Sequence, residues 1–365
     1  MKVLGIETSC DECAAAVVED GRLILSNVVA TQIPFHAEYN GVVPELASRM
    51  HTEWIGRVVQ EALDKASLKV SDIDAAAATA HPGLLGSLLV GLNFAKAFAW
   101  ARGIPFVAVD HMLAHLYAPR LEYKDNFASA SLNSSSGGSA SGKDISYPFL
   151  GLLVSGGHSI ICRADNFDDI TVLGATIDDA VGEAFDKVSK YYGFGYPGGA
   201  VIDKLAQSGN AKAFNFPLPN LHKGDHKYDL SYSGLKTAVI NQLDKFRAKA
   251  ASQGQDRTQD DKPADIAASF QKTAVEILLR SLFRAAEDTG LSTIVAGGGV
   301  AANSYLRAEL AKRKDLRCVF PPLELCGDNG AMVAGIAYCY LARGEQSDLR
   351  TTASARVKSF KRQYP

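Results

Sequence analysis

The chain has 365 residues, with 38 lysines and arginines against 40 aspartates and glutamates, which gives a net charge of −2. This balance argues against a nucleic-acid binder that works by bulk positive charge, although it leaves room for a local basic patch. Hydrophobic residues make up 47% of the chain, so it can form a sizeable core and is not globally disordered. The length predicts about two domains.

The cysteines and the N-terminal region indicate a reducing compartment. The cysteines are too sparse for a disulfide framework, at positions 10, 13, 162, 318, 326 and 339. Cys10 and Cys13 form a single C-x-x-C with no second pair, and we expect both in a strand rather than at a zinc site. Acidic residues interrupt any signal-peptide core near the N-terminus. The apolar stretch 84–101 contains polar side chains that favour a buried helix over a membrane span. The sequence therefore predicts a cytoplasmic protein.

In the first part of the chain, strands and helices alternate. Periodicity and turn residues predict strands at Lys2–Glu7, Cys13–Val18, Leu23–Val29, Ala75–Ala80 and Phe106–Val109, and helices at Glu45–Ala66 and Leu84–Ala101. Asp20-Gly21 is a typical hairpin turn. Gly103 to Pro105 ends the second helix.

The segment 124–144 differs from its surroundings. Between Ser129 and Gly142, seven of fourteen residues are serine and three are glycine, which predicts a poorly ordered surface loop. After it, three strands are predicted again, at Phe149–Val154, Ser159–Arg163 and Ile170–Leu173. They are followed by the irregular segment 250–262, a helix at Ala264–Asp288, a strand at Thr293–Ala296 and an apolar run at Ala331–Leu341. Polar turns follow the first strand of both halves, at 8–12 and 155–158. This repetition favours two related α/β domains that face a shared cleft.

His111 and His115 are spaced for one helix face, where two imidazoles can bind one metal ion. The H-E-x-x-H protease motif would need glutamate at Met112, so a zinc protease of that kind is disfavoured. A third ligand is needed, and Asp328 is a candidate. As an aspartate before an apolar helix, Asp328 could equally be the N-cap of that helix. From spacing alone, the two imidazoles could also have unrelated partners.

Several glycine-rich turns could approach a phosphate. Ser155 to His158 is either such a site or an ordinary hairpin turn. The glycines at 297–299 follow a strand and open a helix, without the spacing of a dinucleotide-binding or Walker motif. A further turn at 196–199 follows the acidic residues of 178–186, which form a solvated helix face or face a cleft.

Ten motifs, taken in order, resemble those of one family. They are GIETSCDE (5–12), VPELASR (43–49), HPGLLGSL (81–88), HMLAHL (111–116), LLVSGGHS (152–159), DDAVGEAFDK (178–187), YPGG (196–199), YSGLKT (232–237), GGGVAAN (297–303) and CGDNGAM (326–332). The chain resembles the TsaD family, the tRNA N6-adenosine threonylcarbamoyltransferases once called O-sialoglycoprotein endopeptidases or glycoproteases, from about residue 1 to 345. The opening motif is similar to the bacterial branch.

This resemblance implies an α/β fold of the actin-like, Hsp70-like and sugar-kinase-like (ASKHA) type, with two duplicated domains around a central cleft. Residues 1–110 would form the first domain, completed by a helix near 328–345. Residues 111–327 would form the second domain, and 346–365 a basic tail.

The resemblance also implies the chemistry. His111, His115 and Asp328 would bind one divalent metal, iron (Fe2+) ahead of zinc. The threonylcarbamoyl-AMP site would be formed by Leu153, Val154, Ser155, Gly156, Gly157, Asp186, Gly199, Asp203 and Asn303. The enzyme would be a metal-dependent acyltransferase that passes the threonylcarbamoyl group to N6 of the adenosine just 3′ of the anticodon, in tRNAs that read codons beginning with A, and releases AMP. Its partners would be tRNA, a TsaB-like paralogous subunit and a TsaE-like P-loop ATPase, with no membrane. No general base is assigned.

The main alternative is an ATPase or sugar kinase of the same superfold, which would need a catalytic aspartate and Mg²⁺ rather than imidazole ligands. A non-catalytic paralogue would have lost the metal ligands. The segment 349–365 contains five basic and no acidic residues, and it is either a solvated tail or a local phosphate contact. Because the rest of the chain is slightly acidic, we expect the isolated chain to bind tRNA weakly.

Overall fold

The computed structural model describes residues 1–39, 41–123, 145–221, 226–254, 262–356 and 360–362. Its strands form two mixed sheets, each of six strands. The first sheet contains β1 (Lys2–Glu7), β2 (Glu12–Glu19), β3 (Leu23–Thr31), β4 (Ala75–His81), β5 (Phe106–Asp110) and β6 (Glu122–Tyr123). The second contains β7 (Phe149–Val154), β8 (Ser159–Ala164), β9 (Ile170–Ala175), β10 (Thr293–Gly297), β11 (Arg317–Val319) and β12 (Phe360–Arg362).

The two sheets have the same layout. Their orders are β5-β4-β1-β2-β3-β6 and β11-β10-β7-β8-β9-β12. In each sheet the first three strands in the chain pair antiparallel, and the other three join them or one another in parallel. The duplicated α/β architecture predicted from the sequence is therefore confirmed, while the domain boundaries stay a prediction.

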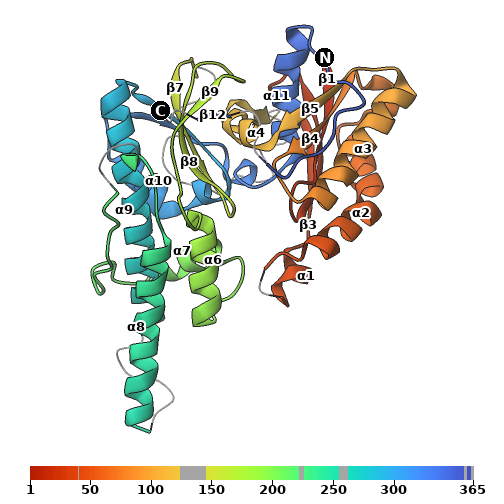
Figure 1. The fold of residues 1–365 in the computed structure, drawn as a ribbon. Coiled ribbons are helices and arrows are strands. Elements are labelled where there is room, and N and C mark those ends of the chain that lie inside the picture. Colours follow the sequence, from red (N-terminus) through yellow and green to blue (C-terminus); the bar gives the residue numbers. More distant parts are fainter. Residues whose placement is uncertain (40, 124–144, 222–225, 255–261, 357–359, 363–365) are drawn as a thin grey trace.

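The helices form three layers around the sheets (Figure 1). The outer face of the first sheet is covered by α2 (Pro44–Lys65) and α3 (Leu85–Arg102). Between the two sheets lie α4 (His111–Tyr117) and α11 (Gly330–Ala342). The outer side of the second sheet carries α6 (Val181–Tyr192), α7 (Gly198–Ala206), α8 (Ser233–Ser252), α9 (Pro263–Thr289) and α10 (Ser304–Ala311). A short helix, α1 (Ile33–Ala37), follows β3.

The middle helix α11 explains how the two halves are joined. Its first eight residues are all buried, as expected for a helix that is apolar on every side and packs between two sheets. Gly330 allows this close approach, because a Cβ there would lie 2.6 Å from the backbone nitrogen of Ala16 in β2. The ends of α4 and α11 are thereby held next to each other, between the sheets.

The predicted strands and long helices are found, with shifts of a few residues at their ends. Among the described residues, the helices α1, α7 and α8 were not predicted, and α8 extends into the segment expected to be irregular. The prediction for Cys10 was wrong: β2 begins at Glu12, so Cys10 lies in the preceding turn. The serine-rich segment 124–144 lies outside the described residues, as do parts of 250–262 and of the basic tail.

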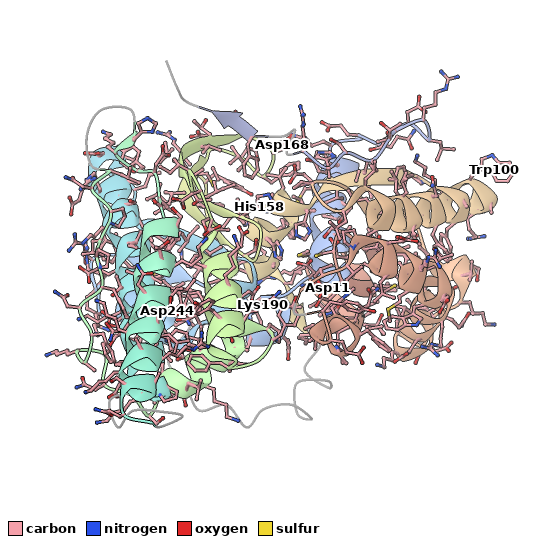
Figure 2. All side chains as sticks on the ribbon, turned by 60° about the horizontal axis from the view of Figure 1, so that its bottom comes forward. Asp11, Trp100, His158, Asp168, Lys190 and Asp244 are labelled. Carbon is pink, nitrogen blue, oxygen red and sulfur yellow. The ribbon has the colours of Figure 1, made fainter. Side chains whose placement is uncertain are left out.

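Among the described helices, none combines the length and apolar character needed to cross a membrane. Of the large apolar side chains that the structure describes, Trp100 is the most exposed, at 76%. It projects from α3 at the outer end of the first half (Figure 2).

Candidate active site

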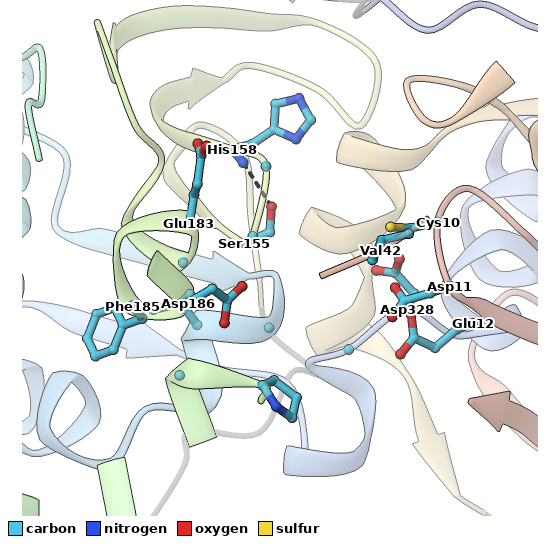
Figure 3. Close-up of a pocket in the computed structure, with 18 of the residues that line it drawn as sticks. Cys10, Asp11, Glu12, Val42, Ser155, His158, Glu183, Phe185, Asp186 and Asp328 are labelled. Carbon is cyan, nitrogen blue, oxygen red and sulfur yellow. Dashed lines mark hydrogen bonds between the residues drawn. The ribbon is translucent and has the colours of Figure 1, made fainter. Parts of the chain in front are cut away.

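A cavity of about 820 Å³ lies between the two halves. One wall contains Cys10 and Asp11 from the turn before β2 and Glu12 at the start of β2, together with the metal-ligand candidates His111 and Asp328. The facing wall comes from the β7–β8 turn, the start of α7 and the segment before α10, and is lined by Ser155, Gly156, Gly157, His158, Asp186, Gly199, Asp203 and Asn303. Figure 3 shows Asp11, Glu12 and Asp328 across the cavity from Ser155 and Asp186.

The three predicted metal ligands meet at one edge of this cavity. Their ligand atoms all lie within 4.8 Å of one another. The Nε2 atoms of His111 and His115 lie 3.5 and 3.1 Å from Oδ1 of Asp328. Asp110 sets the start of α4, because its side chain accepts hydrogen bonds from the backbone N–H groups of the first turn. The cap fixes the phase of the helix, and with it the direction of both imidazoles.

Asp328 is available for this role because its neighbour caps α11. The sequence left open that Asp328 is the N-cap, and the structure corrects this: Asn329 is the cap, and its side chain accepts a hydrogen bond from the backbone N–H of Met332 at 3.0 Å. The carboxylate of Asp328 therefore points toward the histidines instead of the helix.

Glu7, at the end of β1, is a site residue that the sequence reasoning missed. Its side chain is fully buried and accepts hydrogen bonds from Ser9 N at 2.6 Å, from Thr79 Oγ1 at 2.5 Å and from His111 Nδ1 at 3.1 Å. A carboxylate on the far ring nitrogen orients a ligating histidine and leaves Nε2 free as a ligand. The alternating strand pattern gave no sign that this residue differs from its neighbours.

The carboxylates around His111 favour positive charge in this cluster. Burial acts to lower the pKa of His111, but the charges of Asp328 and Glu7 outweigh it and raise this pKa to about 9. Burial acts to raise the pKa of Asp328, but the adjacent histidines outweigh it and hold this pKa well below the usual range. Two carboxylates beside two imidazoles are balanced by a proton on His111 or by a divalent cation. Two imidazoles and one carboxylate, with a carboxylate behind one imidazole, form a donor set that fits such a cation.

Burial raises the pKa of Glu12 to about 10, with a further contribution from the charges of Asp328 and Asp11. His158 on the facing wall has the opposite shift: burial, followed by the charges of His111 and His115, lowers its pKa to about 4. Each shift favours the neutral form of its side chain. The sequence reasoning had not singled out Glu12 as part of the site, and it included His158 only as the last residue of a candidate phosphate turn.

At its glycines, the facing wall presents backbone rather than side chains. A Cβ on Gly156, Gly157 or Gly199 would meet nothing within 4 Å, so these positions leave backbone groups open toward the cavity. Gly298 is required for a different reason: its φ is +93°, and a Cβ would lie 2.4 Å from the carbonyl oxygen of Val154. Such a wall suits a phosphate-bearing ligand.

The polar residues of this wall are held by one another. Asp186 accepts a hydrogen bond from Gly198 N at 2.7 Å. Burial raises its pKa, although the N–H groups of Gly198 and Gly199 act to lower it. Asp203 accepts from Ser304 Oγ at 2.7 Å and from Asn303 Nδ2 at 3.3 Å. Asn303 in turn caps α10. These bonds join α6 to the start of α7, and α7 to the start of α10, at the cavity.

Two of the predicted residues do not present side chains to the cavity. Leu153 and Val154 lie in β7, each 1% exposed, and pack in the cores on either side of the second sheet. Only their backbone could serve a ligand. His115 is also almost completely buried and lies behind His111.

Comparison with known proteins identifies similar chains. The family model for TsaD, tRNA N6-adenosine threonylcarbamoyltransferase, matches residues 23–335. A tRNA N6-adenosine threonylcarbamoyltransferase of Treponema denticola is 62% identical over 360 residues, covering 99% of this chain and 98% of the relative. Relatives with the same name from Treponema pallidum and Borreliella burgdorferi are 54% and 48% identical, covering 99% and 100% of this chain and 94% and 96% of their own lengths.

Solved structures resemble the chain in fold. Component A of the Acidaminococcus fermentans (R)-2-hydroxyglutaryl-CoA dehydratase has a TM-score of 0.51 at 15% identity, covering 94% of this chain and 99% of that chain. Full-length HypF in a phosphate- and nucleotide-bound form has a TM-score of 0.55 at 13% identity, covering 95% of this chain and 47% of its own. The fold is thus of the predicted actin-like, Hsp70-like and sugar-kinase-like type.

Proposed function

The chain belongs to the family of tRNA N6-adenosine threonylcarbamoyltransferases, and from this premise we propose how its cavity serves the reaction. The protein is an acyltransferase that passes a threonylcarbamoyl group to N6 of the adenosine just 3′ of the anticodon. The names of its relatives do not favour the alternative of an ATPase or sugar kinase. The observation that carries the proposal is the meeting of His111, His115 and Asp328 across one cavity from the Ser155–Gly157 turn.

The donor would be threonylcarbamoyl-AMP, a mixed anhydride. N6 of adenosine attacks the carbamoyl carbon, the bond from this carbon to the phosphate oxygen breaks, and AMP leaves with that oxygen while N6 loses a proton. An exocyclic amine is a weak nucleophile, so catalysis depends on positioning and on stabilising the charge that develops on oxygen. No nucleophilic side chain is required.

His111, His115 and Asp328 would hold the divalent metal, and Glu7 would orient His111. A metal bound there supplies positive charge to oxygens that become more negative during transfer. We propose iron (Fe2+), because two histidines and one carboxylate with open positions are a typical Fe(II) donor set, although zinc binds similar sets.

The facing wall would bind the adenylate. The backbone of Leu153 to Gly157 and the open position at Gly199 would approach the phosphate and sugar. Asp186, Asp203 and Asn303 would bind polar groups of the nucleotide. The hydrogen bonds from Gly198 N to Asp186 and from Asn303 Nδ2 to Asp203 support this role, because they hold the polar groups in place before a ligand arrives.

We further propose that the protein acts in the cytoplasm with a TsaB-like paralogous subunit and a TsaE-like P-loop ATPase. The net charge of −2 supports shared tRNA binding, since this chain alone offers little excess positive charge to a polyanion. The segments 1–110 and 111–327 are proposed as the two domains, with the helix near 328–345 completing the first and 346–365 as a basic tail.

The test is direct. The purified protein, with the subunits that copurify with it, is incubated with threonylcarbamoyl-AMP and unmodified tRNA, and the tRNA nucleosides are analysed by mass spectrometry. We expect threonylcarbamoyladenosine and an equal amount of AMP. Normal levels of this nucleoside in cells that lack the gene and any paralogue would overturn the assignment.

A further inference from the structure

Three fully buried polar side chains lie behind the wall that contains Asp11. Gln32 precedes α1, His36 lies in α1, and His51 lies on the inner face of α2, and each is 0% exposed. None of the three lines the cavity. Buried polar groups of this kind are costly unless all their hydrogen bonds are made.

The three side chains form one continuous chain of hydrogen bonds. Val43 N donates to His36 Nδ1 at 3.3 Å, and His36 Nε2 lies 3.1 Å from Gln32 Oε1. Gln32 Nε2 lies 3.2 Å from His51 Nδ1 and donates to Ala47 O at 3.3 Å. His51 Nε2 lies 2.9 Å from Cys10 O.

The backbone groups at the two ends determine every proton between them. Because Val43 N–H can only donate, His36 Nδ1 accepts and its Nε2 carries the proton that reaches Gln32 Oε1. The amide nitrogen of Gln32 then donates to His51 Nδ1, so His51 donates through Nε2 to the Cys10 carbonyl. Both imidazoles are neutral with the proton on Nε2, and burial lowers the pKa of His51, which favours this state.

Both ends of this chain belong to segments that line the cavity. Cys10 and Asp11 line it at one end, and Gly41 and Val42, next to Val43, line it at the other. A backbone bond from Gln32 N to Asp11 O at 3.0 Å ties Gln32 to the first of these segments, and one from Gly41 N to His36 O at 3.4 Å ties His36 to the second. Figure 3 shows Val42 beside Cys10 and Asp11.

We propose that His51 is a positioning residue for the transfer reaction: through Gln32 and His36 it fixes the Cys10–Glu12 turn against the Gly41–Val43 segment. This inference rests on the proposed function, because it assigns the held wall to the cavity in which transfer takes place. His51 touches no substrate; it acts through the backbone that places Asp11 and Glu12. A displaced wall would slow transfer while leaving the metal ligands of α4 and α11 in place.

The test compares three variants in the transfer assay. His51→Leu removes the donor to Cys10 and the acceptor for Gln32, and we expect kcat to fall roughly tenfold to a hundredfold. His51→Gln can still donate to the Cys10 carbonyl, and we expect it to recover a measurable part of that loss. Val59→Ala is the matched control: it lies on α2 in the apolar core of the first half, so it loses stability but retains kcat at a temperature where it is folded. Metal content should be unchanged in all three.

A second readout does not depend on turnover. In protein with ¹⁵N-labelled histidine, long-range ¹H–¹⁵N spectra should show His36 and His51 as neutral Nε2–H tautomers at pH 7. A folded His51→Leu protein with normal kcat, or a charged or Nδ1–H form of His51, would overturn the inference. If the wild-type protein transfers nothing, the proposed function fails, and the tautomer measurement still tests the hydrogen-bond chain.

Discussion

The turn from β1 to β2 and the turn from β7 to β8 occupy the same place in two sheets of the same layout, yet they present opposite chemistry to the cavity. The first is rich in acidic side chains, at Glu7, Asp11 and Glu12, and Glu7 is held by three side-chain hydrogen bonds. The second, Ser155 to Gly157, offers backbone and one hydroxyl. This difference shows that two copies of one scaffold can take on different binding roles: one turn is suited to a cation and the other to an anionic nucleotide.

The largest effect is expected where the first wall meets the metal ligands. Asp328→Ala, or His111→Ala, should abolish both bound metal and transfer while the fold stays intact, because a donor is lost and no core contact is removed. Metal analysis by mass spectrometry and the transfer assay measure the two losses. Full transfer by a metal-free His111→Ala, Asp328→Ala double variant would contradict the cation-binding role of the first wall.

The neighbour of Asp328 provides the control. Asn329→Ala removes the cap of α11 and should cost about 0.5–2 kcal/mol of stability, while metal content stays normal. Two adjacent residues should therefore have separate effects, one on chemistry and one on folding. Denaturant unfolding of both variants tests this separation.

Sequence patterns were sufficient for part of this site. The spacing of His111 and His115 predicted one helix face, and α4 has that geometry. The same reasoning could not decide between ligand and helix cap for Asp328, because the choice depends on whether Asn329 satisfies the free N–H groups of α11. Only the fold settles which of two adjacent polar residues does so.

Other parts of the site had no local signal. Glu7 reads as the last residue of an ordinary strand, and its three donors come from positions 9, 79 and 111. Leu153 was included through family resemblance, although its side chain points into the core. The strands were predictable because burial on one or both faces imposes a pattern, whereas α7 and α10 begin at glycine-rich turns whose geometry depends on the neighbouring wall.

A smaller effect, on metal affinity, is expected at Glu7, which contacts the proposed ligand His111 from the side away from the cavity. Glu7→Gln keeps the shape of the side chain but places an NH₂ group among three donors, so one of them loses its acceptor. His111 is then less firmly oriented, and we expect metal affinity to fall about tenfold to a hundredfold. Metal titration against a competing chelator measures this change. An unchanged affinity would mean that the buried carboxylate serves the turn alone.

On the glycine-rich wall, the effect should be on binding. Gly157→Ala places a methyl group into the open cavity, and we expect KM for threonylcarbamoyl-AMP to rise several-fold with little change in stability. Gly56→Ala is the matched control, because a Cβ there also meets nothing within 4 Å but lies on exposed α2. It should leave KM unchanged and add about 0.5–1 kcal/mol of stability. Equal KM values for both variants would contradict a nucleotide site at the second turn.

The smallest effect is expected for Asp178, an acidic residue that stabilises the fold of the second half and does not face the cavity. Asp178 accepts hydrogen bonds from Ser231 Oγ at 2.5 Å and from Tyr232 N and Ser233 N, at the start of α8, at 2.8 and 3.3 Å. Partial burial acts upward on its pKa, but these hydrogen bonds outweigh it and lower the pKa below the usual value. Since the side chain is largely exposed, we expect Asp178→Asn to cost only about 1 kcal/mol at pH 7.

The sign of the pH dependence follows from that lowered pKa. A carboxylate whose pKa is lower in the folded state contributes stability above its unfolded value of about 3.9, and this contribution is lost as pH falls through the folded pKa. The difference in unfolding free energy between wild type and Asp178→Asn should therefore be largest at neutral pH and shrink below pH of about 4. Urea unfolding at pH 7 and pH 3 measures it. A difference that grows on acidification, or a loss of transfer in the folded variant, would contradict a purely structural role for Asp178.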